Sequence, residues 1–275
     1  LGADLRFATP IPLAATGLGI NGFMGEFVAH GKRNVDTAQP DVVKRELDWY
    51  AKKIGAGLSP ADQKFAPEKD QWALGLGIVL GTLPDAGFSL NVEGMVGVAF
   101  PELEVLLGVN AKFMASPPAV SDNKANADSA ALTGLLVIGQ DAVTVAIKGV
   151  YEIPSILNLT IPVGARFPYP SSNDPFFIRI GADNQAPRFG DPVSATVLPG
   201  SLEQKAWCYL MFEERELLNL GGVDALDFNG FSVGMGAGWG IDYSAGPFRL
   251  TADAREVSLT GRSGIYDVTV ETQTG

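Results

Sequence analysis

Strict alternation of bulky apolar with small or polar residues over residues 87–113 constrains the fold more than any other feature. The even positions, which are bulky and apolar apart from one glycine, are Phe88, Leu90, Val92, Gly94, Val96, Val98 and Phe100. The odd positions, which form the small or polar set, are Gly87, Ser89, Asn91, Glu93, Met95, Gly97 and Ala99. Pro101 interrupts the run, and the odd positions from Leu103 to Phe113 repeat the pattern. A period of two is that of a strand with one face in the core. We therefore expect an antiparallel hairpin whose bulky face is buried.

Comparable runs recur along the chain, so the hairpin belongs to a larger sheet. Without crossover helices between the runs, a parallel βαβ fold is excluded. The pattern predicts a mainly β fold, an antiparallel multi-strand meander that forms a sandwich, a barrel or a curved open sheet. We expect one β-rich domain over residues 1–275. The runs are 17–30, 72–81, 132–139, 142–151, 156–167, 176–181, 231–243, 248–260 and 265–272.

One packed α-helix is expected near residues 40–55. Val43, Leu47, Tyr50 and Ile54 form a single apolar stripe at the helical period. Pro40 suits the first turn of this helix, and Gly55 suits its end. Residues 206–212 are apolar on both faces and predict a buried strand. Loops are expected at 119–131, 168–175 and 183–200.

Composition excludes several classes of function. The net charge of −11 argues against a nucleic-acid or anionic-membrane surface, which needs clustered Lys and Arg. A single cysteine excludes an internal disulfide, and a single histidine excludes His-rich metal sites. The longest apolar stretch, residues 72–83, is too short for a transmembrane helix. The chain has no signal-peptide pattern and begins without methionine, and we expect it to be a segment of a longer polypeptide.

Gly230–Gly234 matches the G-x-S-x-G pattern of a hydrolase nucleophile elbow. However, seven alternations from Phe231 to Tyr243 predict a strand that continues straight through Ser232. The single histidine, His30, precedes the serine, whereas α/β-hydrolases carry theirs after it. We therefore assign no catalytic residue and keep a serine hydrolase that uses Ser232 as an alternative.

The other face of the same predicted strand is lined with glycine. Such a face allows close approach of a backbone, an aromatic ring or a ligand. A dinucleotide loop would need a helix after these glycines, and none is expected. Packing is the favoured interpretation, and the candidates for ligand binding are Gly234, Gly236, Gly238 and Trp239.

The remaining polar candidates have simpler explanations. His30 is expected at the end of a strand, and Cys208 is expected to be a small buried apolar residue. Asp122, Asn126 and Asp128 have calcium-like spacing without the glycine and glutamate of an EF-hand loop, so no metal site is predicted. The acidic run at 213–216 could supply paired carboxylates, but any acidic cluster in a chain with a net charge of −11 matches that pattern, so a solvated cluster is the favoured interpretation.

Short motifs spread over most of the chain suggest a context. They are Thr9–Leu13 with Thr16–Gly19, Gly75–Gly77 with Leu80–Thr82, Phe177–Asp183, Tyr209–Met211 and Gly238–Gly240. Together they resemble passages of very large bacterial β-rich proteins that carry a domain of unknown function. The resemblance implies a segment of a longer bacterial polypeptide, and no catalytic or binding residue carries over.

These observations predict a non-catalytic structural or binding module of a large bacterial protein. Its expected partner is another protein or the remainder of its own long chain, without nucleic acid, transmembrane helix or cofactor. The alternative is a carrier of a hydrophobic small molecule such as a lipid, with an apolar groove or barrel lumen. Packing of the apolar faces against each other would exclude the carrier. The segment does not distinguish a cytoplasmic from an exported protein.

Overall fold

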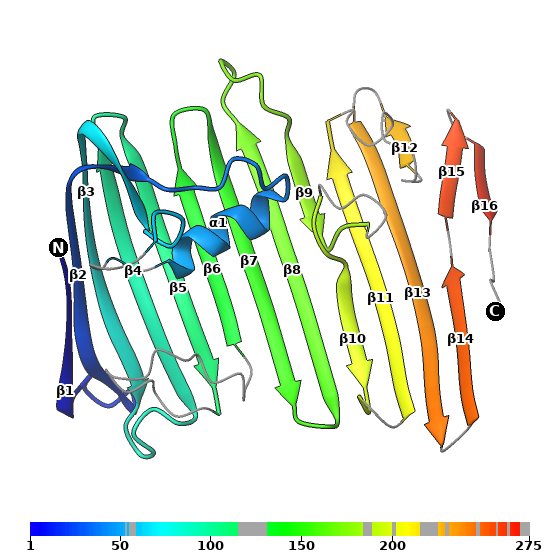
Figure 1. The fold of residues 1–275 in the computed structure, drawn as a ribbon, viewed down its shortest axis with the longest axis horizontal. Coiled ribbons are helices and arrows are strands. Elements are labelled where there is room, and N and C mark those ends of the chain that lie inside the picture. Colours follow the sequence, from blue (N-terminus) through cyan, green and yellow to red (C-terminus); the bar gives the residue numbers. More distant parts are fainter. Residues whose placement is uncertain are drawn as a thin grey trace. The chain divides into compact units, whose positions relative to one another are not determined.

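The structure is a computed structural model of a mainly β protein (Figure 1). It describes residues 1–52, 54, 59–114, 131–183, 189–199, 202–214, 225–228, 231–245, 248–256, 258–262 and 265–269. Its contacts divide the chain into two compact units. The first comprises residues 1–38 and 44–147, and the second comprises residues 39–43 and 148–275. The prediction of a single domain stays a prediction.

The first unit is an antiparallel meander in which neighbours in the sequence are neighbours in the sheet, from β1 to β7. Among the described residues β1 pairs with β2 alone, so this sheet does not close into a barrel. The hairpin predicted at 87–113 is confirmed, with Leu90 opposite Phe113 and Ala99 opposite Glu104. The strands are β1 (Gly2–Pro12), β2 (Leu18–Arg33), β3 (Phe65–Thr82), β4 (Leu90–Phe100), β5 (Glu104–Phe113), β6 (Ala131–Ile138) and β7 (Ala142–Ile153), the last of which continues into the second unit.

The predicted helix is confirmed as α1 (Val42–Ala51). The side chain of Asp41 caps it, because its Oδ1 accepts a hydrogen bond of 2.9 Å from the Val43 N–H. The expected stripe is buried at Val43 and Leu47. Trp49 and Glu46 lie outside that stripe and are also buried. The helix therefore packs against a surface that accepts both aromatic and charged side chains.

In the second unit, β11 and β13 pair with each other in antiparallel orientation over twelve positions. The described pairs are antiparallel except for one position between β12 and β15. The straight strand expected at 231–243 is confirmed by β13. Residues 206–212 form a strand within β11, but the expectation that this strand is buried on both faces is wrong, because Ala206, Cys208 and Leu210 are exposed. The elements are β8 (Leu157–Pro168), β9 (Phe177–Ile180), β10 (Val193–Val197), β11 (Leu202–Glu213), β12 (Ala225–Phe228), β13 (Phe231–Ala245), β14 (Phe248–Glu256), β15 (Ser258–Arg262) and β16 (Ile265–Thr269).

Four segments differ from the sequence prediction. β10 lies inside the expected loop at 183–200, where a short alternating run of five residues pairs with β8 and β11. β1 and β12 were not predicted, since prolines or short length obscure their alternation. The expected run 248–260 is divided between β14 and β15. Most of the expected loop at 119–131 lies outside the described residues.

Candidate functional site

The sheet of the first unit exposes a continuous apolar surface, which we call the open face. Its side chains come from β2, β3, β4 and β5, and each is between 40% and 64% exposed. Each is large and apolar, and the most exposed of them is Leu76. They are Phe23, Phe27, Trp72, Leu74, Leu76, Val96, Phe100 and Leu107.

Strand register arranges the open face in rows. Leu76 lies opposite Val96, and Val96 lies opposite Leu107, so one row crosses three strands. Trp72 lies opposite Phe100 in another row, and its ring centroid is 6.0 Å from that of Phe27. Side chains directly opposite on antiparallel strands are close enough to form one surface. The open face is therefore a contiguous patch.

This arrangement corrects the expectation that the bulky face of residues 87–113 is buried. Val96 and Phe100 are exposed, whereas Met95 and Gly97 on the small or polar side are buried. The reason is that α1 packs against the side with small residues, where backbone and aromatic rings can approach closely. Alternation identified the two faces correctly but not the one that is covered.

A hollow of about 480 Å³ lies within the open face. The side chains of Phe23, Leu76, Val96 and Leu107 surround it, and Gly94 contributes to its floor. A Cβ atom built on Gly94 would meet one atom, Cγ2 of Ile78, at 3.9 Å. Position 94 therefore contributes open space to the hollow, and the volume of the hollow is in the range of small-molecule sites.

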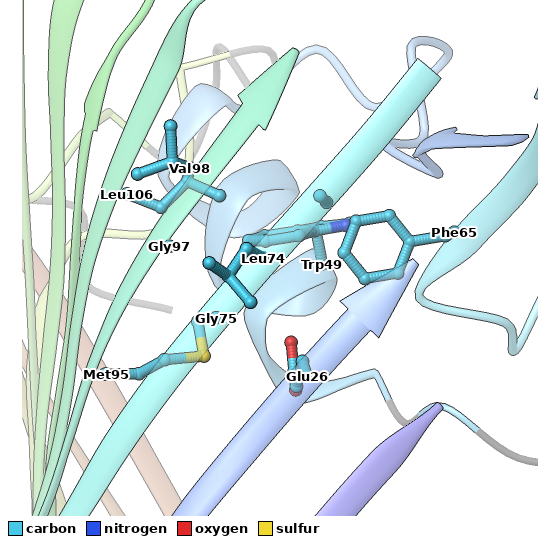
Figure 2. A pocket seen from close by; sticks show the side chains of 10 residues that line it. Glu26, Trp49, Phe65, Leu74, Gly75, Met95, Gly97, Val98 and Leu106 are labelled. Atoms are coloured by element: carbon cyan, nitrogen blue, oxygen red, sulfur yellow. The ribbon is translucent and has the colours of Figure 1, made fainter. Parts of the chain in front are cut away.

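The opposite side of the same sheet is the covered face, which includes Glu26, Met95, Gly97, Leu106 and Gly108. Trp49 of α1 is 1% exposed, and its Nε1–H donates a 2.8 Å hydrogen bond to the Lys64 carbonyl. Figure 2 shows Trp49 beside Phe65, with Glu26 and Met95 on the neighbouring strands. The cavity among these residues has a volume of about 10 Å³, enough for one water molecule. This side of the sheet is filled.

Ion pairs neutralise the charges on the covered face. Lys64 Nζ lies 2.7 Å from Glu26 Oε1. Arg33 binds Glu46 at 2.5 Å and Glu104 at 2.7 Å, and its guanidinium carbon lies 3.9 Å from the centre of the Trp49 ring. Buried charges are tolerated when they are paired in this way. The network explains how charged residues lie under a helix while apolar residues face water.

Tyr50 makes the second aromatic contact of α1 with the sheet, against Gly108 of β5. A Cβ atom on Gly108 would come within 3.0 Å of three atoms of its ring and hydroxyl group. Burial, followed by the negative charges of Glu93 and Glu26, raises the pKa of Tyr50 to about 12. The phenol is therefore neutral at physiological pH and acts as a packing group.

Aromatic rings cover the glycine face predicted in the second unit. Cβ atoms on Gly236 and Gly238 would come within 3.0 Å of the rings of Tyr209 and Trp207, respectively. These two rings are stacked, with centroids 6.2 Å apart. Trp239 points away from this packing and is 47% exposed. A ligand at Gly234, Gly236, Gly238 and Trp239 stays a prediction.

Ser232 is fully buried within β13, opposite Glu213 of β11 and Asp227 of β12. Its backbone continues as a strand on the C-terminal side and does not turn into a helix. Glu213 forms an ion pair with Arg179, so it is a buried structural carboxylate and not part of a solvated cluster. Arg215 and Glu216 of the same run lie outside the described residues.

Cys208 is exposed, which corrects the expectation of a buried residue. In β11 the even positions 208 and 210 face solvent, and the odd positions Tyr209 and Met211 are buried. His30 is exposed in β2, where its Nδ1 accepts a 3.3 Å hydrogen bond from the Asp70 N–H. Asp122, Asn126 and Asp128 lie outside the described residues. The described residues contain no group of three or more potential metal ligands.

The open-face residues were not candidates from the sequence, because their bulky side chains were expected in a core. The residues of the covered face did carry a sequence signal for the side that α1 covers. Glu26, Arg33 and Lys64 belong to the side that also carries glycines, and Trp49 of the helix has the size to fill the space above Gly97 and Leu106. A helix rich in aromatic and charged residues fits such a surface.

Within the described part of the chain, none of the helices has the length and apolar character needed to cross a membrane. Comparison with protein-family models, curated proteins and solved structures found no match for this chain.

Proposed function

We propose that this chain is a non-catalytic binding module and that the open face of its first unit is the binding surface. The observation that carries the proposal is the exposure of eight large apolar side chains on one side of the sheet. Soluble monomers rarely expose contiguous apolar patches larger than a few hundred Å², and larger ones mark interaction sites. A partner that covers this surface removes apolar area from water, which is favourable by about 25 cal/mol per Å².

The distribution of charge supports the same function. The ion pairs of Arg33 and Lys64 lie on the covered face. The eight side chains of the open face are uncharged, and so are the residues that share their rows, which include Gly25, Ile78, Gly94, Val98, Val105 and Val109. A partner that covers the open face therefore does not have to desolvate an ion among those eight positions. This is favourable for binding an apolar surface.

The position of Ser232 supports the non-catalytic part of the proposal. Hydrolase nucleophiles lie on a sharp turn from strand to helix that exposes the hydroxyl group. Ser232 is instead 0% exposed within β13. We expect a serine-reactive phosphonate probe to leave the protein unlabelled, and labelling that disappears in Ser232→Ala would favour the hydrolase.

The binding surface can be tested with the fluorescent apolar dye bis-ANS and two matched variants. Leu76→Asp places a charge in the centre of the open face, and we expect it to reduce dye binding at least fivefold in protein diluted until the wild-type chain is monomeric. Leu103→Asp is the control, because Leu103 is 56% exposed but lies in the turn between β4 and β5. Equal dye binding by both variants and the wild-type chain would contradict the assignment of the open face.

A carrier of a hydrophobic small molecule is the second candidate function, and the hollow of about 480 Å³ favours it. Its wall combines Phe23, Leu76, Val96 and Leu107, all apolar. Native mass spectrometry and organic extraction of the purified chain test this candidate. Reproducible recovery of one lipid class, lost in Gly94→Leu, would make the carrier the better account.

A further inference from the structure

The open face has the area and the shape to pair with an identical surface. We propose that its partner is a second copy of this chain, packed face to face around a two-fold axis, with Leu76 of each copy in the hollow of the other. This inference rests on the proposed binding function of the open face and names the partner. It makes the chain a homodimer in which two single sheets form one sandwich.

The exposed area is close to what a stable dimer requires. Eight large side chains that are 40% to 64% exposed present roughly 700 Å² of surface, taking about 200 Å² for each when fully exposed. Specific protein interfaces bury about 800 Å² on each partner. The open face therefore supplies most of such an interface before any contribution from its rim.

The chemistry of the face suits an identical partner. Face-to-face packing of two sheets brings apolar side chains from both into a layer about 10 Å thick. Each copy carries a net charge of −11, so association requires a surface on which acidic groups do not meet. The row of Leu76, Val96 and Leu107 meets that requirement, because its members are uncharged and directly opposite one another.

The open face has a projecting side chain next to a hollow, so its shape is complementary to a second copy of itself. Leu76 is its most exposed side chain at 64%, and it lies at the edge of the hollow above Gly94. In a two-fold pair the same patch is used by both copies, so a projection beside a hollow can insert reciprocally. Gly94 leaves the space for this insertion, since a Cβ there would meet a single atom at 3.9 Å.

A small lipid covers this face less well than a second sheet. Ligand sites bury 70–90% or more of a drug-sized ligand, which requires walls on several sides. The hollow is formed by one side of a single sheet, from residues of β2, β3, β4 and β5. A second sheet encloses the hollow and at the same time covers Trp72 and Phe100, which lie outside it.

The test is sedimentation-equilibrium ultracentrifugation of the full 275-residue chain. We expect the wild-type chain to form a dimer, Leu76→Asp to weaken the dimer at least a hundredfold, and Leu103→Asp to leave its dissociation constant unchanged within twofold. Circular dichroism and urea unfolding verify that each variant is folded. A wild-type chain that remains monomeric at about 100 μM, or a dimer that Leu76→Asp leaves intact, would overturn the proposal.

A double-mutant cycle tests the insertion itself. Gly94→Leu fills the hollow, and Leu76→Ala removes the projection, so each alone should weaken the dimer about tenfold or more. Together they exchange projection and hollow, and the double variant should bind within about fivefold of the wild-type chain. Additive losses would overturn the proposed insertion.

Dye binding distinguishes the homodimer from the more general proposal that the open face is a binding surface. A monomer that still binds bis-ANS, and loses it in Leu76→Asp, would overturn the homodimer and leave the binding module supported. A monomer whose dye binding is insensitive to Leu76→Asp would overturn both.

Discussion

The two faces of the first unit's sheet are made by the same strands and the same alternation, yet they have opposite environments. The covered face buries Met95, Gly97 and the ion pair between Lys64 and Glu26 beneath α1. The open face exposes Leu74, Leu76 and Val96. The difference teaches that the interior side of a sheet is decided by what can pack on it. Small residues and glycines admit the aromatic rings of a helix, whereas a row of branched side chains accommodates another flat apolar surface.

The largest expected difference between the faces concerns two tryptophans. Trp49→Ala on the covered face should destabilise the chain by about 3–5 kcal/mol, because it leaves a cavity and removes a ring that stacks with Arg33. Trp72→Ala on the open face should cost less, about 1–2 kcal/mol, since Trp72 is 44% exposed and the rest of its ring lies against Phe27 and His30. Urea unfolding of dilute protein measures both. Equal losses would mean that the open face is also an interior surface.

Ion pairs provide the second comparison. Glu46→Gln should cost about 2 kcal/mol, because Arg33 and Glu46 are each 8% exposed in their side chains and Arg33 would keep Glu104 as its remaining charged partner. The matched control is Glu102→Gln, which removes a 4.0 Å pair with Lys32 whose side chains are more than half exposed. That variant should stay within about 0.5 kcal/mol of the wild-type chain. A similar loss in both would contradict the burial assigned to Arg33 and Glu46.

Two glycines give a third comparison, of steric space alone. Gly108→Val should destabilise by about 2 kcal/mol, because its Cβ would collide with the Tyr50 ring. Gly94→Val should be neutral or slightly stabilising in the monomer, since its Cβ has open space and valine favours strands. Thermal and urea unfolding at low protein concentration measure both substitutions. Destabilisation by Gly94→Val equal to that by Gly108→Val would show that the hollow is filled in the folded monomer.

Much of the fold follows from local pattern, because alternation and turn residues are local properties. The hairpin at 87–113, the straight strand through Ser232 and the helix near 40–55 are confirmed. β10 was missed because its alternation of valine and alanine with serine and threonine covers only five residues inside a stretch rich in proline and glycine. Cys208 was misassigned because the flanking Trp207 and Tyr209 suggested burial, whereas each successive residue of a strand faces the other side.

The candidate site was less predictable than the fold. Its residues, such as Leu76 and Val96, were visible as a bulky face, but which face is covered depends on the contacts of α1. Those contacts are long-range: Trp49 reaches Lys64, and Tyr50 reaches Gly108. No window of a few residues contains both partners. Which face of the sheet is covered is therefore determined by tertiary contacts.

The smallest expected effect uses pH to probe the covered face. Because the pKa of Tyr50 is raised from 10.0 to about 12 in the folded chain, folding favours its neutral form. Its contribution is complete below pH 10 and is lost as pH rises from 10 through 12, where the unfolded chain ionises first. At pH 11 the loss should be about 1.4 kcal/mol. Tyr50→Phe should remove this part of the alkaline destabilisation, whereas Tyr151→Phe, a substitution at a residue that is 37% exposed, should retain it. Urea unfolding at pH 8 and pH 11 measures the difference, and an identical pH dependence in the wild-type chain and Tyr50→Phe would place the Tyr50 hydroxyl in water and contradict the packing of α1 on Gly108.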